Sequence, residues 1–302
     1  MTSVALVSAR AARGLDEDMP PLLAAFAAAG VRAEIADWDD DGVEWGRYDA
    51  ALLRSAWDYT ERLGEFLAWV ERTARLTRLL NPPAVVRWNS DKHYLAQLAA
   101  AGVPTVSSTF CEPGDQAPEV LARCLEAHAA AELVVKPAVG AGSRDTRRHA
   151  RDAVADILAH MRVLLAARRS VLLQPYLPSV EQDGETALIY IGGQFSHAIR
   201  KGPLLPAGAP ATTALFAPEE ITARTPAADE RAVGAQTLAV LPFAELLYAR
   251  VDLIRGAAGE PLLLELELTE PSLFFAHAAG SAARLAQATL ARLVRPPAAA
   301  DT

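Results

Sequence analysis

Short apolar runs alternate with a helical pattern at the beginning of the chain. Three runs of strand length occupy residues 4–8, 31–36 and 50–54. Residues 18–30 carry apolar positions at helical spacing and end at a glycine. This alternation predicts a small parallel sheet whose loops at the carboxyl ends of the strands face a ligand. A helix over 61–80 is expected next, and Asn81-Pro82-Pro83 should end it because proline cannot continue a helix.

A second group of helices and strands follows in the middle of the chain. Asn89 or Ser90 is expected to cap a helix that runs to Ala101 and is closed by Gly102 and Pro104. Further apolar runs predict strands over 105–110, 133–136 and 171–174, and helices over 117–130 and 152–168.

The last part of the chain contains two predicted hairpins. One is formed by residues 186–191 and 194–200 around Gly192-Gly193, and the other by two apolar runs within 248–267. Residues 201–226 are rich in Pro, Gly and Thr with weak periodicity, which indicates a mobile loop or lid. The remaining segments are predicted to be a loop at 175–184, helices at 227–239 and 281–294, and a disordered tail at 295–302.

These patterns predict an α/β protein of three domains. The expected boundaries are residues 1–83, 84–174 and 175–302. The length of 302 residues is sufficient for two or three packed lobes with a full core.

Composition and charge exclude several classes of protein. A hydrophobic content of 51% with 22% charged residues is typical of a globular protein, and the net charge of −8 argues against a nucleic-acid binder. No apolar run reaches the roughly twenty residues of a membrane span, and the N-terminus resembles a first strand rather than a signal peptide. Cys111 and Cys124 fit neither a disulfide framework nor a zinc site, so we expect a cytoplasmic location.

Three carboxylates stand out in the hairpin over 248–267. Glu265 and Glu267 alternate on one run, so they should project to the same face, and pairing of the two runs would bring Asp252 beside them. Carboxylates gathered in an apolar sheet repel one another unless a cation lies between them. Oxygen ligands of this kind suit Mg²⁺, although an amphipathic hairpin with its acidic face in water is the alternative.

A lysine and a glycine-rich turn follow a buried-looking strand. Lys136 ends the run, and Gly140-Ala141-Gly142-Ser143 comes shortly after. Backbone N–H groups of such a turn can approach phosphate oxygens while a lysine neutralises their charge, but an ordinary turn is the alternative. The sequence matches neither the Walker pattern nor the dinucleotide-binding glycine pattern. Lys92, at the expected helix start, opposes the helix dipole and so indicates a compensating anion, unless it is a solvated surface residue.

The segment after the strand at 171–174 suggests a nucleotide cleft. Gln174 and the backbone that follows could face an adenine edge, with Tyr176 and Leu177 as apolar walls, or the segment is simply a strand end. Glu185 could accept hydrogen bonds from ribose hydroxyls, and Glu181 competes for that role.

The order of these segments resembles the ATP-grasp superfamily of carboxylate ligases, and the glutathione-synthetase-like branch in particular. The matching residues cover about two thirds of the chain in the expected order: 89–92, 101–104, 134–137, 140–143, 174–177, 184–185, 250–252 and 265–267. The resemblance implies an N-terminal Rossmann-like preATP-grasp lobe, a small central α+β lobe and a C-terminal antiparallel-sheet lobe. It places an ATP cleft between the last two lobes.

The resemblance also implies roles for individual residues. Lys92 and Lys136 would hold the ATP phosphates, the loop with Gly140, Gly142 and Ser143 would close over them, and Glu185 would bind ribose. Asp252, Glu265 and Glu267 would hold one or two Mg²⁺ ions, with Mn²⁺ as an expected substitute. Many superfamily members have Asn where Glu267 stands, and the extra negative charge suits a metal. Arg250 would steady the acyl phosphate, and Lys201 is expected to be catalytic with it.

Three further segments, at 53–59, 195–201 and 267–274, resemble the cyclo-ligases of cycloserine biosynthesis, which close O-ureido-D-serine into a ring. This likeness makes five residues candidates for the substrate pocket: Arg54, Ser55, Asp58, Glu270 and Ser272. An arginine suits a carboxylate and an acidic residue suits an ammonium group. A local ion pair between Arg54 and Asp58 is the alternative for those two residues.

The function expected from these observations is ATP- and Mg²⁺-dependent ligation of a small carboxylate substrate to an amine nitrogen, with release of ADP and phosphate. Cyclisation of O-ureido-D-serine or a related amino-acid derivative is the specific expectation. An intermolecular amino-acid or peptide ligase is the alternative enzyme, and a non-catalytic nucleotide-binding regulator is the alternative of another class. No nucleic-acid or membrane partner is expected, and an isologous homodimer would be ordinary for this class.

Overall fold

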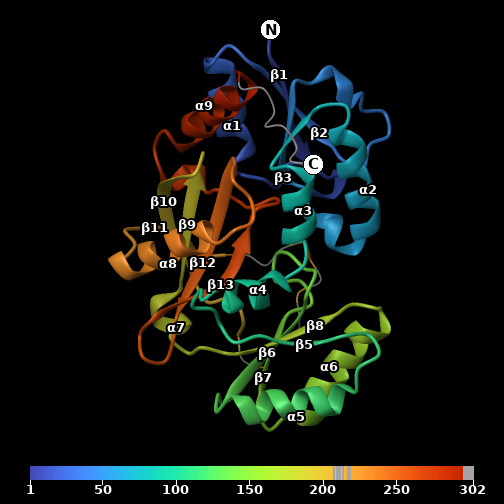
Figure 1. Cartoon of the computed structure of the whole chain (residues 1–302), viewed down its shortest axis with the longest axis vertical. Coiled ribbons are helices and arrows are strands. Elements are labelled where there is room, and N and C mark those ends of the chain that lie inside the picture. Colours follow the sequence, from blue (N-terminus) through green and yellow to red (C-terminus); the bar gives the residue numbers. More distant parts are fainter. Residues whose placement is uncertain (207, 209–211, 213, 216–218, 295–302) are drawn as a thin grey trace.

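The structure, a computed structural model, describes residues 1–206, 208, 212, 214–215 and 219–294. Within them the strands form three sheets, which Figure 1 shows from the N-terminal lobe at the top to a separate lobe at the bottom. No helix among these residues combines the length and apolar character needed to cross a membrane.

The N-terminal lobe contains a parallel sheet of order β2-β1-β3-β4. Its strands are β1 (Ser3–Ser8), β2 (Arg32–Asp37), β3 (Ala50–Ser55) and β4 (Arg78–Leu80). Every residue of β1 and β3 is buried, as expected when helices cover both faces of a parallel sheet. The helices of this lobe are α1 (Met19–Ala28) and α2 (Leu63–Ala74), with short 3₁₀ turns at Arg10–Ala12, Trp45–Arg47 and Trp57–Glu61. The predicted strands and the helix over 18–30 are confirmed.

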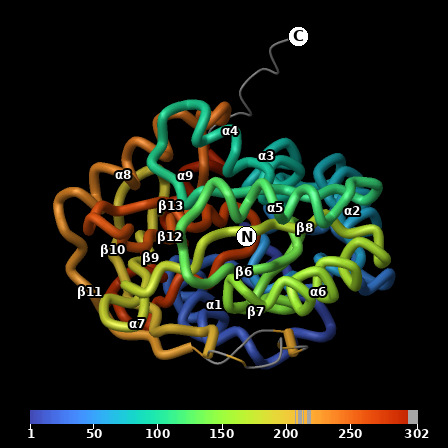
Figure 2. The backbone as a smooth tube through the Cα atoms, turned by 90° about the horizontal axis from the view of Figure 1, so that it is seen from below, coloured from blue at the N-terminus to red at the C-terminus, as the bar shows by residue number. Residues whose placement is uncertain are grey.

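The lobe at the bottom of Figure 1 is built on an antiparallel sheet of order β5-β8-β6-β7. Its strands are β5 (Thr109–Cys111), β6 (Glu132–Pro137), β7 (Arg147–Ala150) and β8 (Val171–Pro175). The helices α5 (Ala117–Ala127) and α6 (Val154–Ala166) lie side by side on one face (Figures 1 and 2). Leu133 and Val135 pack under these helices, so the alternate residues Val134 and Lys136 point to the opposite face.

The third sheet is antiparallel, in the order β11-β10-β9-β12-β13. Its strands are β9 (Glu185–Ile191), β10 (Gln194–Lys201), β11 (Ile221–Arg224), β12 (Tyr248–Arg255) and β13 (Pro261–Glu267). Both predicted hairpins are present: β9 pairs with β10 across Gly192-Gly193, and β12 pairs with β13. The helices around this sheet are α3 (Pro83–Asn89), α4 (Tyr94–Ala100), α7 (Val180–Asp183), α8 (Ala228–Ala239) and α9 (Ser281–Val294), with a 3₁₀ turn at Phe275–His277.

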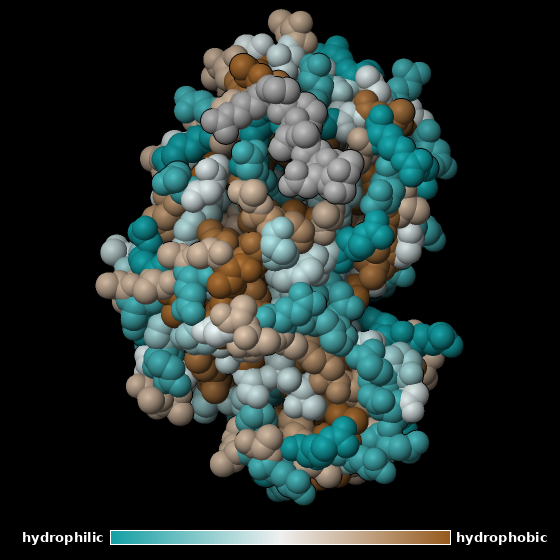
Figure 3. Space-filling view, in the orientation of Figure 1, coloured by the Kyte–Doolittle hydropathy of each residue, from teal (hydrophilic) through white to brown (hydrophobic). Residues whose placement is uncertain are grey.

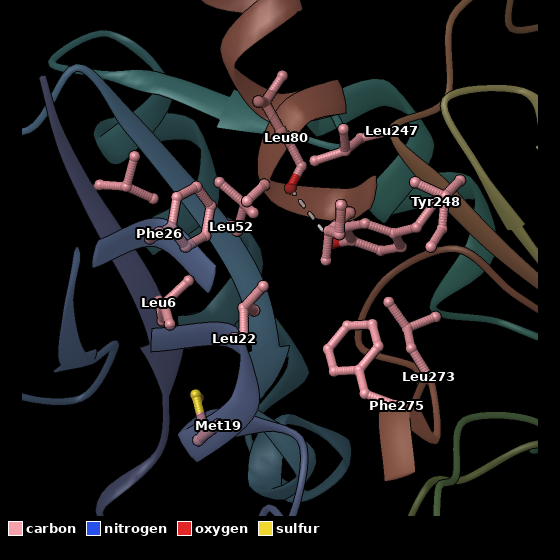
Figure 4. Packing of buried hydrophobic residues seen from close by; sticks show 14 of the residues in the cluster. Leu6, Met19, Leu22, Phe26, Leu52, Leu80, Leu247, Tyr248, Leu273 and Phe275 are labelled. Atoms are coloured by element: carbon pink, nitrogen blue, oxygen red, sulfur yellow. Dashed lines mark hydrogen bonds between the residues drawn. The ribbon is translucent and has the colours of Figure 1, made fainter. Parts of the chain in front are cut away.

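The N-terminal lobe and the third sheet share one hydrophobic core. Figure 4 shows Leu22 and Phe26 of α1 facing Tyr248 and Phe275 across this core. The Tyr248 hydroxyl lies 3.2 Å from the carbonyl oxygen of Leu80, the hydrogen bond drawn in Figure 4. The lobe with α5 and α6 has its own core, and Figure 3 shows a notch in the outline where it joins the rest. The N-terminal lobe is therefore fixed on the third sheet.

The prediction of one helix over 61–80 is wrong. Helix α2 ends at Ala74, and the last residues form β4, which pairs in parallel with β3. Leu79 and Leu80 are buried where β4 pairs with β3. This tertiary contact makes the segment a strand, although its apolar spacing also fits a helix.

The prediction of a single helix from Asn89 to Ala101 is also wrong. Helix α3 begins at Pro83 and ends at Asn89, and α4 begins only at Tyr94. Asn89 is therefore not a helix cap: its side chain accepts a hydrogen bond from the Leu268 N–H and donates one to the Leu266 carbonyl oxygen. The buried amide thus serves the backbone of the last sheet strand, a long-range contact that helix-capping rules do not detect.

Smaller differences concern loops. The predicted loop at 175–184 contains α7, the strand expected over 105–110 is shortened to β5, and β7 was not predicted. The segment predicted as a loop over 201–226 includes the end of β10 and all of β11. The predicted disorder of 295–302 lies outside the described residues.

Candidate active site

A cavity of about 540 Å³ lies where the three sheets meet. The strands β6, β8, β10, β12 and β13 form one part of its lining, which we call the strand wall. Loops from the N-terminal lobe and the segment after β13 form the other part, the loop wall. Most of the predicted site residues line it: Lys92, Lys136, Gly140, Gly142, Ser143, Gln174, Tyr176, Leu177, Glu185, Lys201, Arg250, Glu265, Glu267, Glu270 and Ser272.

The chain contains three lysines, and all three line this cavity. Lys92 donates to the carbonyl oxygen of Gly140 at 2.5 Å and lies 2.8 Å from Glu265. It is buried, which excludes the alternative of a solvated surface lysine. Lys136 is buried as well, and it takes part in no ion pair with a described residue. Burial lowers its pKa, and the nearby charge of Lys92 adds to this against the opposing effect of Glu265. An anion at Lys136 would relieve this cost.

The carboxylates of the β12–β13 hairpin alternate with cations. Asp252 lies opposite Glu265, and Arg250 lies opposite Glu267, so the predicted pairing that brings Asp252 beside the two glutamates is confirmed. The Arg250 guanidinium bonds to Asp252 at 2.9 Å and also to Glu267. Charge alternation therefore replaces much of the repulsion expected among carboxylates alone.

Lys201 lies deeper in this network. Its Nζ is 2.8 Å from both Glu185 and Asp252. Burial disfavours its charge, but the two carboxylates outweigh that effect and raise the pKa of Lys201 well above its usual value. Asp252 is almost fully buried behind Lys201 and Arg250 and does not line the cavity. It can reach a metal ion only if these cations change partners.

The residues that do line the cavity fit a divalent cation. Burial raises the pKa of Glu267 to about 7, because Asp252 and Glu265 add to the desolvation that Arg250 opposes. Burial also raises the pKa of Glu270 to about 8, with Glu267 as the next cause. Negative charge is thus crowded at Glu265, Glu267 and Glu270, and oxygen donors are the ligands that Mg²⁺ prefers. In the described part of the chain, no group of three such side chains is already arranged as a metal site.

The part of the cavity where the sequence predicts the nucleotide base is apolar. Tyr176 and Leu177 form part of its wall, and the wall residues Val106, Val134, Ile254 and Leu264 belong to or pack on the same apolar cluster. Arg148 stacks on the Tyr176 ring at 3.6 Å from its centroid. Glu181 bonds to the Tyr176 hydroxyl at 2.5 Å and to Arg148 at 2.7 Å, away from the wall, whereas Glu185 lies on the wall. The geometry thus favours Glu185 over Glu181 for contact with a ligand.

Three of the five predicted substrate residues do not reach the cavity. Arg54 is fully buried, donates to the carbonyl oxygen of Pro271 at 2.8 Å and lies 3.6 Å from Asp18. The Ser55 hydroxyl lies 2.9 Å from that of Ser8. Asp58 bonds to Arg62 at 2.6 Å and to the Trp38 indole at 2.8 Å, so a local ion pair between Arg54 and Asp58 is wrong. These three side chains therefore stabilise the N-terminal lobe and do not face the cavity.

Sequence reasoning missed the acidic loop before α1. Leu15, Asp16, Glu17 and Asp18 all line the cavity. Asp18 accepts three backbone N–H groups, from Leu273 at 2.6 Å, Phe274 at 3.0 Å and Phe275 at 2.8 Å. The available signal was the run of acidic residues in the loop after the first parallel strand, at the edge where such sheets bind ligands. Trp57 also lines the cavity and donates to the Glu270 carbonyl oxygen at 3.2 Å.

Comparison with known proteins identifies close relatives of this arrangement. Residues 4–81 match the family described as the N-terminal domain of D-cycloserine synthetase DcsG. The chain is 43% identical to the cycloserine biosynthesis protein DcsG of Streptomyces lavendulae, over 97% of this chain and 99% of the relative. The crystal structure of D-cycloserine synthetase DcsG superposes with a TM-score of 0.91 at 41% identity, covering 96% of this chain and 99% of the other.

More distant structures share the fold alone. The ATP-grasp ligase PsnB, complexed with a minimal precursor, Mg and ADP, has a TM-score of 0.63 at 20% identity, covering 97% of this chain and 98% of that one. The D-alanine–D-alanine ligase of Bacillus anthracis has a TM-score of 0.63 at 13% identity, with 98% of each chain covered. The predicted ATP-grasp fold is confirmed, and the chain belongs to the DcsG family.

Proposed function

We propose that this protein closes O-ureido-D-serine, or a closely related amino-acid derivative, into a ring at the expense of ATP. The observation that carries the proposal is the meeting of all three lysines of the chain with the Arg250–Glu267 network in one cavity. Its charge pattern suits a triphosphate, a divalent cation and a carboxylate together. The relationship to the cycloserine biosynthesis protein DcsG supports the substrate.

Each predicted binding role is part of this proposal. Lys92 and Lys136 bind phosphate oxygens, and the Gly140–Ser143 loop closes over them. Gly142 and Ser143 both have positive φ, near 60°, which fits a turn that presents backbone N–H groups. The nucleotide base lies against Gln174, Tyr176 and Leu177, and its ribose hydroxyls bond to Glu185, with Glu181 supporting Tyr176.

The reacting groups lie at the hairpin. Glu265 and Glu267 would hold Mg²⁺, joined by Asp252 once Lys201 and Arg250 change partners, and the ion would supply charge neutralisation at the phosphates. Arg250 and Lys201 stabilise the charge that develops on the transferred phosphoryl group and on the acyl carbon. Glu270 and Ser272 contact the amino-acid part of the substrate.

The chemistry takes place in two steps. The γ-phosphoryl group passes to the substrate carboxylate and ADP leaves. The nitrogen bonded to the side-chain oxygen then attacks the acyl carbon, loses its proton and expels phosphate, closing a five-membered ring. Closure alone removes one water relative to the substrate and leaves a carbamoyl group on the ring nitrogen. D-cycloserine also lacks that carbamoyl group, so its formation requires an additional hydrolysis.

The test is ADP release with Mg²⁺-ATP across amino acids, dipeptides and O-ureido-D-serine, with mass analysis of products. We expect ADP with O-ureido-D-serine and either the carbamoyl ring or D-cycloserine, and ADP release roughly 10²–10³-fold slower from the Lys136→Ala variant. A product joining two panel members would make the protein an intermolecular ligase. ATP binding without turnover of any compound would favour the nucleotide-binding regulator.

The proposal extends to the cellular compartment, the choice of metal and the oligomeric state. We place the reaction in the cytoplasm, where ATP is available, and the free thiols of Cys111 and Cys124 agree with a reducing compartment. Substitution of Mn²⁺ for Mg²⁺ and formation of a homodimer stay predictions. Titration of activity with each metal and the solution mass of the protein test them.

A further inference from the structure

Asp16 is a buried carboxylate that the predicted site does not use. It lies on the loop between Ala12 and α1, is 8% exposed and lines the cavity. One oxygen, Oδ1, accepts the Asp18 backbone N–H at 3.0 Å. The other, Oδ2, is closed off from solvent and has no hydrogen-bond partner in the part of the chain that the structure describes.

An unpartnered carboxylate oxygen away from water is costly, because it loses its solvation without compensation. Burial raises the pKa of Asp16, and the positive charge of Arg54 and a contact with the Ser55 hydroxyl oppose this only in part. Arg54 itself donates to Pro271 and stands nearest to Asp18, so it does not satisfy Asp16 directly. Its Nε and Nη1 likewise lack hydrogen-bond partners among the described residues.

The loop that carries Asp16 is held rigidly. Asp18 binds the backbone of Leu273, Phe274 and Phe275, and Figure 4 shows Leu273 and Phe275 packed opposite the α1 side chains Met19 and Leu22. The segment after β13, whose Ser272 lines the cavity, is thereby fixed to the Asp16 loop. The backbone that carries Asp16 is therefore positioned before a ligand binds, and only its side chain has to turn toward the cavity.

The distribution of charge in the cavity indicates which part of a ligand Asp16 receives. The lysines and arginines that line the cavity lie on strands of the two antiparallel sheets or on turns outside the Asp16 loop: Lys92, Lys136, Arg144, Lys201 and Arg250. Phosphates and the reacting carboxylate are attracted to these residues. An ammonium group is repelled from these cations and is drawn to a carboxylate that they do not pair with, and Asp16 can form a charge-assisted hydrogen bond with it.

We propose that Asp16 binds the α-ammonium group of the amino-acid substrate and so orients its carboxylate toward the strand wall. The inference rests on the proposed function and adds the residue that selects an amino acid over a simple carboxylic acid. Asp16 acts here as a binding residue, with Arg54 and Asp18 as the residues that position it.

The test combines one variant with one substrate analogue. Asp16→Asn keeps the shape and the acceptor for the Asp18 N–H but removes the charge, and the analogue is O-ureido-D-serine without its amino group. With the unmodified protein, kcat/KM should fall roughly 10- to 100-fold from substrate to analogue, as for loss of one charged hydrogen bond. Asp16→Asn should show a similar fall with the substrate itself and little further fall with the analogue. Its KM for ATP should change less than about 2-fold. Asp41→Asn, at an exposed position outside the cavity, is the matched control and should behave as the unmodified protein.

The outcomes separate the inference from the function. If Asp16→Asn still discriminates between substrate and analogue as strongly as the unmodified protein, the ammonium contact lies elsewhere. Equal use of both compounds by the unmodified protein would overturn the inference without any variant, even if Asp16→Asn failed to fold. If the unmodified protein turned over neither compound, the proposed function itself would fail and this inference with it.

Discussion

The two walls of the cavity are built in different ways. The strand wall carries Lys92, Lys201 and Arg250, each in an ion pair with a carboxylate at or below 3.0 Å. The loop wall carries Asp16, whose Oδ2 has no hydrogen-bond partner among the described residues. The buried Arg54 lies behind this wall. Among the described residues, the first wall pairs its cations with carboxylates except at Lys136, whereas the second has a carboxylate oxygen without a hydrogen-bond partner.

The two walls therefore suit different tasks: the strand wall suits phosphoryl transfer, and the loop wall suits recognition of the substrate. Phosphoryl transfer needs fixed, mutually compensated charges that do not reorganise during the reaction. Recognition of a substrate needs a polar group whose partner arrives only with the substrate. We therefore expect changes on the strand wall to affect turnover and changes on the loop wall to affect substrate choice or the fold.

The strongest test of the strand wall is Lys136→Ala. Lys136 is the buried cation outside the ion pairs of the described residues, so we expect it to gain its partner from the nucleotide. Its loss should lower kcat for ADP release by roughly 10²–10³-fold, comparable to removing one preorganised donor from an active site. Steady-state ADP release measures this, with circular dichroism as the control for folding. Near-normal turnover by a folded Lys136→Ala protein would refute the phosphate role.

Arg54→Ala tests whether the loop wall depends on a buried cation for its structure. We expect a loss of roughly 3–5 kcal/mol in the free energy of unfolding, because Asp18 and the Pro271 carbonyl lose their buried partner. Urea unfolding measures it. Arg10→Ala, which breaks an exposed ion pair with Asp40, is the control and should leave the free energy of unfolding nearly unchanged. A stable Arg54→Ala protein with a raised KM for the amino-acid substrate alone would return Arg54 to the substrate pocket.

Glu265→Gln separates metal binding from the pairing with Lys92. The substitution removes a charge that lies 2.8 Å from Lys92 and lines the cavity. If Glu265 is a metal ligand, the Mg²⁺ concentration for half-maximal activity should rise by roughly 10-fold, as for the loss of one ligand or its support. A Mg²⁺ titration measures the shift. An unchanged titration with a raised KM for ATP would mean that Glu265 only positions Lys92.

Most of the strand wall could be predicted from the sequence. Glu265 and Glu267 alternate on a strand, and a hairpin brings Asp252 opposite Glu265, so period and pairing were sufficient. The lysines carry a further signal. A chain with 29 basic residues keeps three lysines, and all three lie in the cavity, which indicates positions where arginine does not serve.

The loop wall could not be predicted in the same way. Asp18 contacts residues more than 250 positions away, and Asn89 contacts the strand end near Leu268. Such contacts depend on how the N-terminal lobe packs on the third sheet, and no local spacing encodes them. For the same reason Arg54 resembled a pocket residue in the sequence, while the fold uses it as support behind the wall.

The smallest expected effect is on the pH dependence of stability. It concerns Glu270, which follows the last strand of the strand wall. Burial, followed by repulsion from Glu267, raises the pKa of Glu270 to about 8 in the folded protein, against 4.5 for an ordinary glutamate. The folded state therefore holds a proton that the unfolded state releases. This stability is fully present below about pH 4.5 and is lost as pH rises through 8.

Glu270→Gln should abolish that loss, because its amide is neutral at every pH. Without ligand, Tm of the unmodified protein should fall more steeply between pH 5 and 9 than Tm of the variant, with a difference of a few degrees at the alkaline end. Glu44→Gln, at an exposed position, is the control and should leave the slope unchanged. Thermal melts across this pH range measure the comparison. Parallel curves for Glu270→Gln and the unmodified protein would mean that Glu270 is already ionised in the fold, and the excess of negative charge at this position would have to be balanced by the lysines of the strand wall.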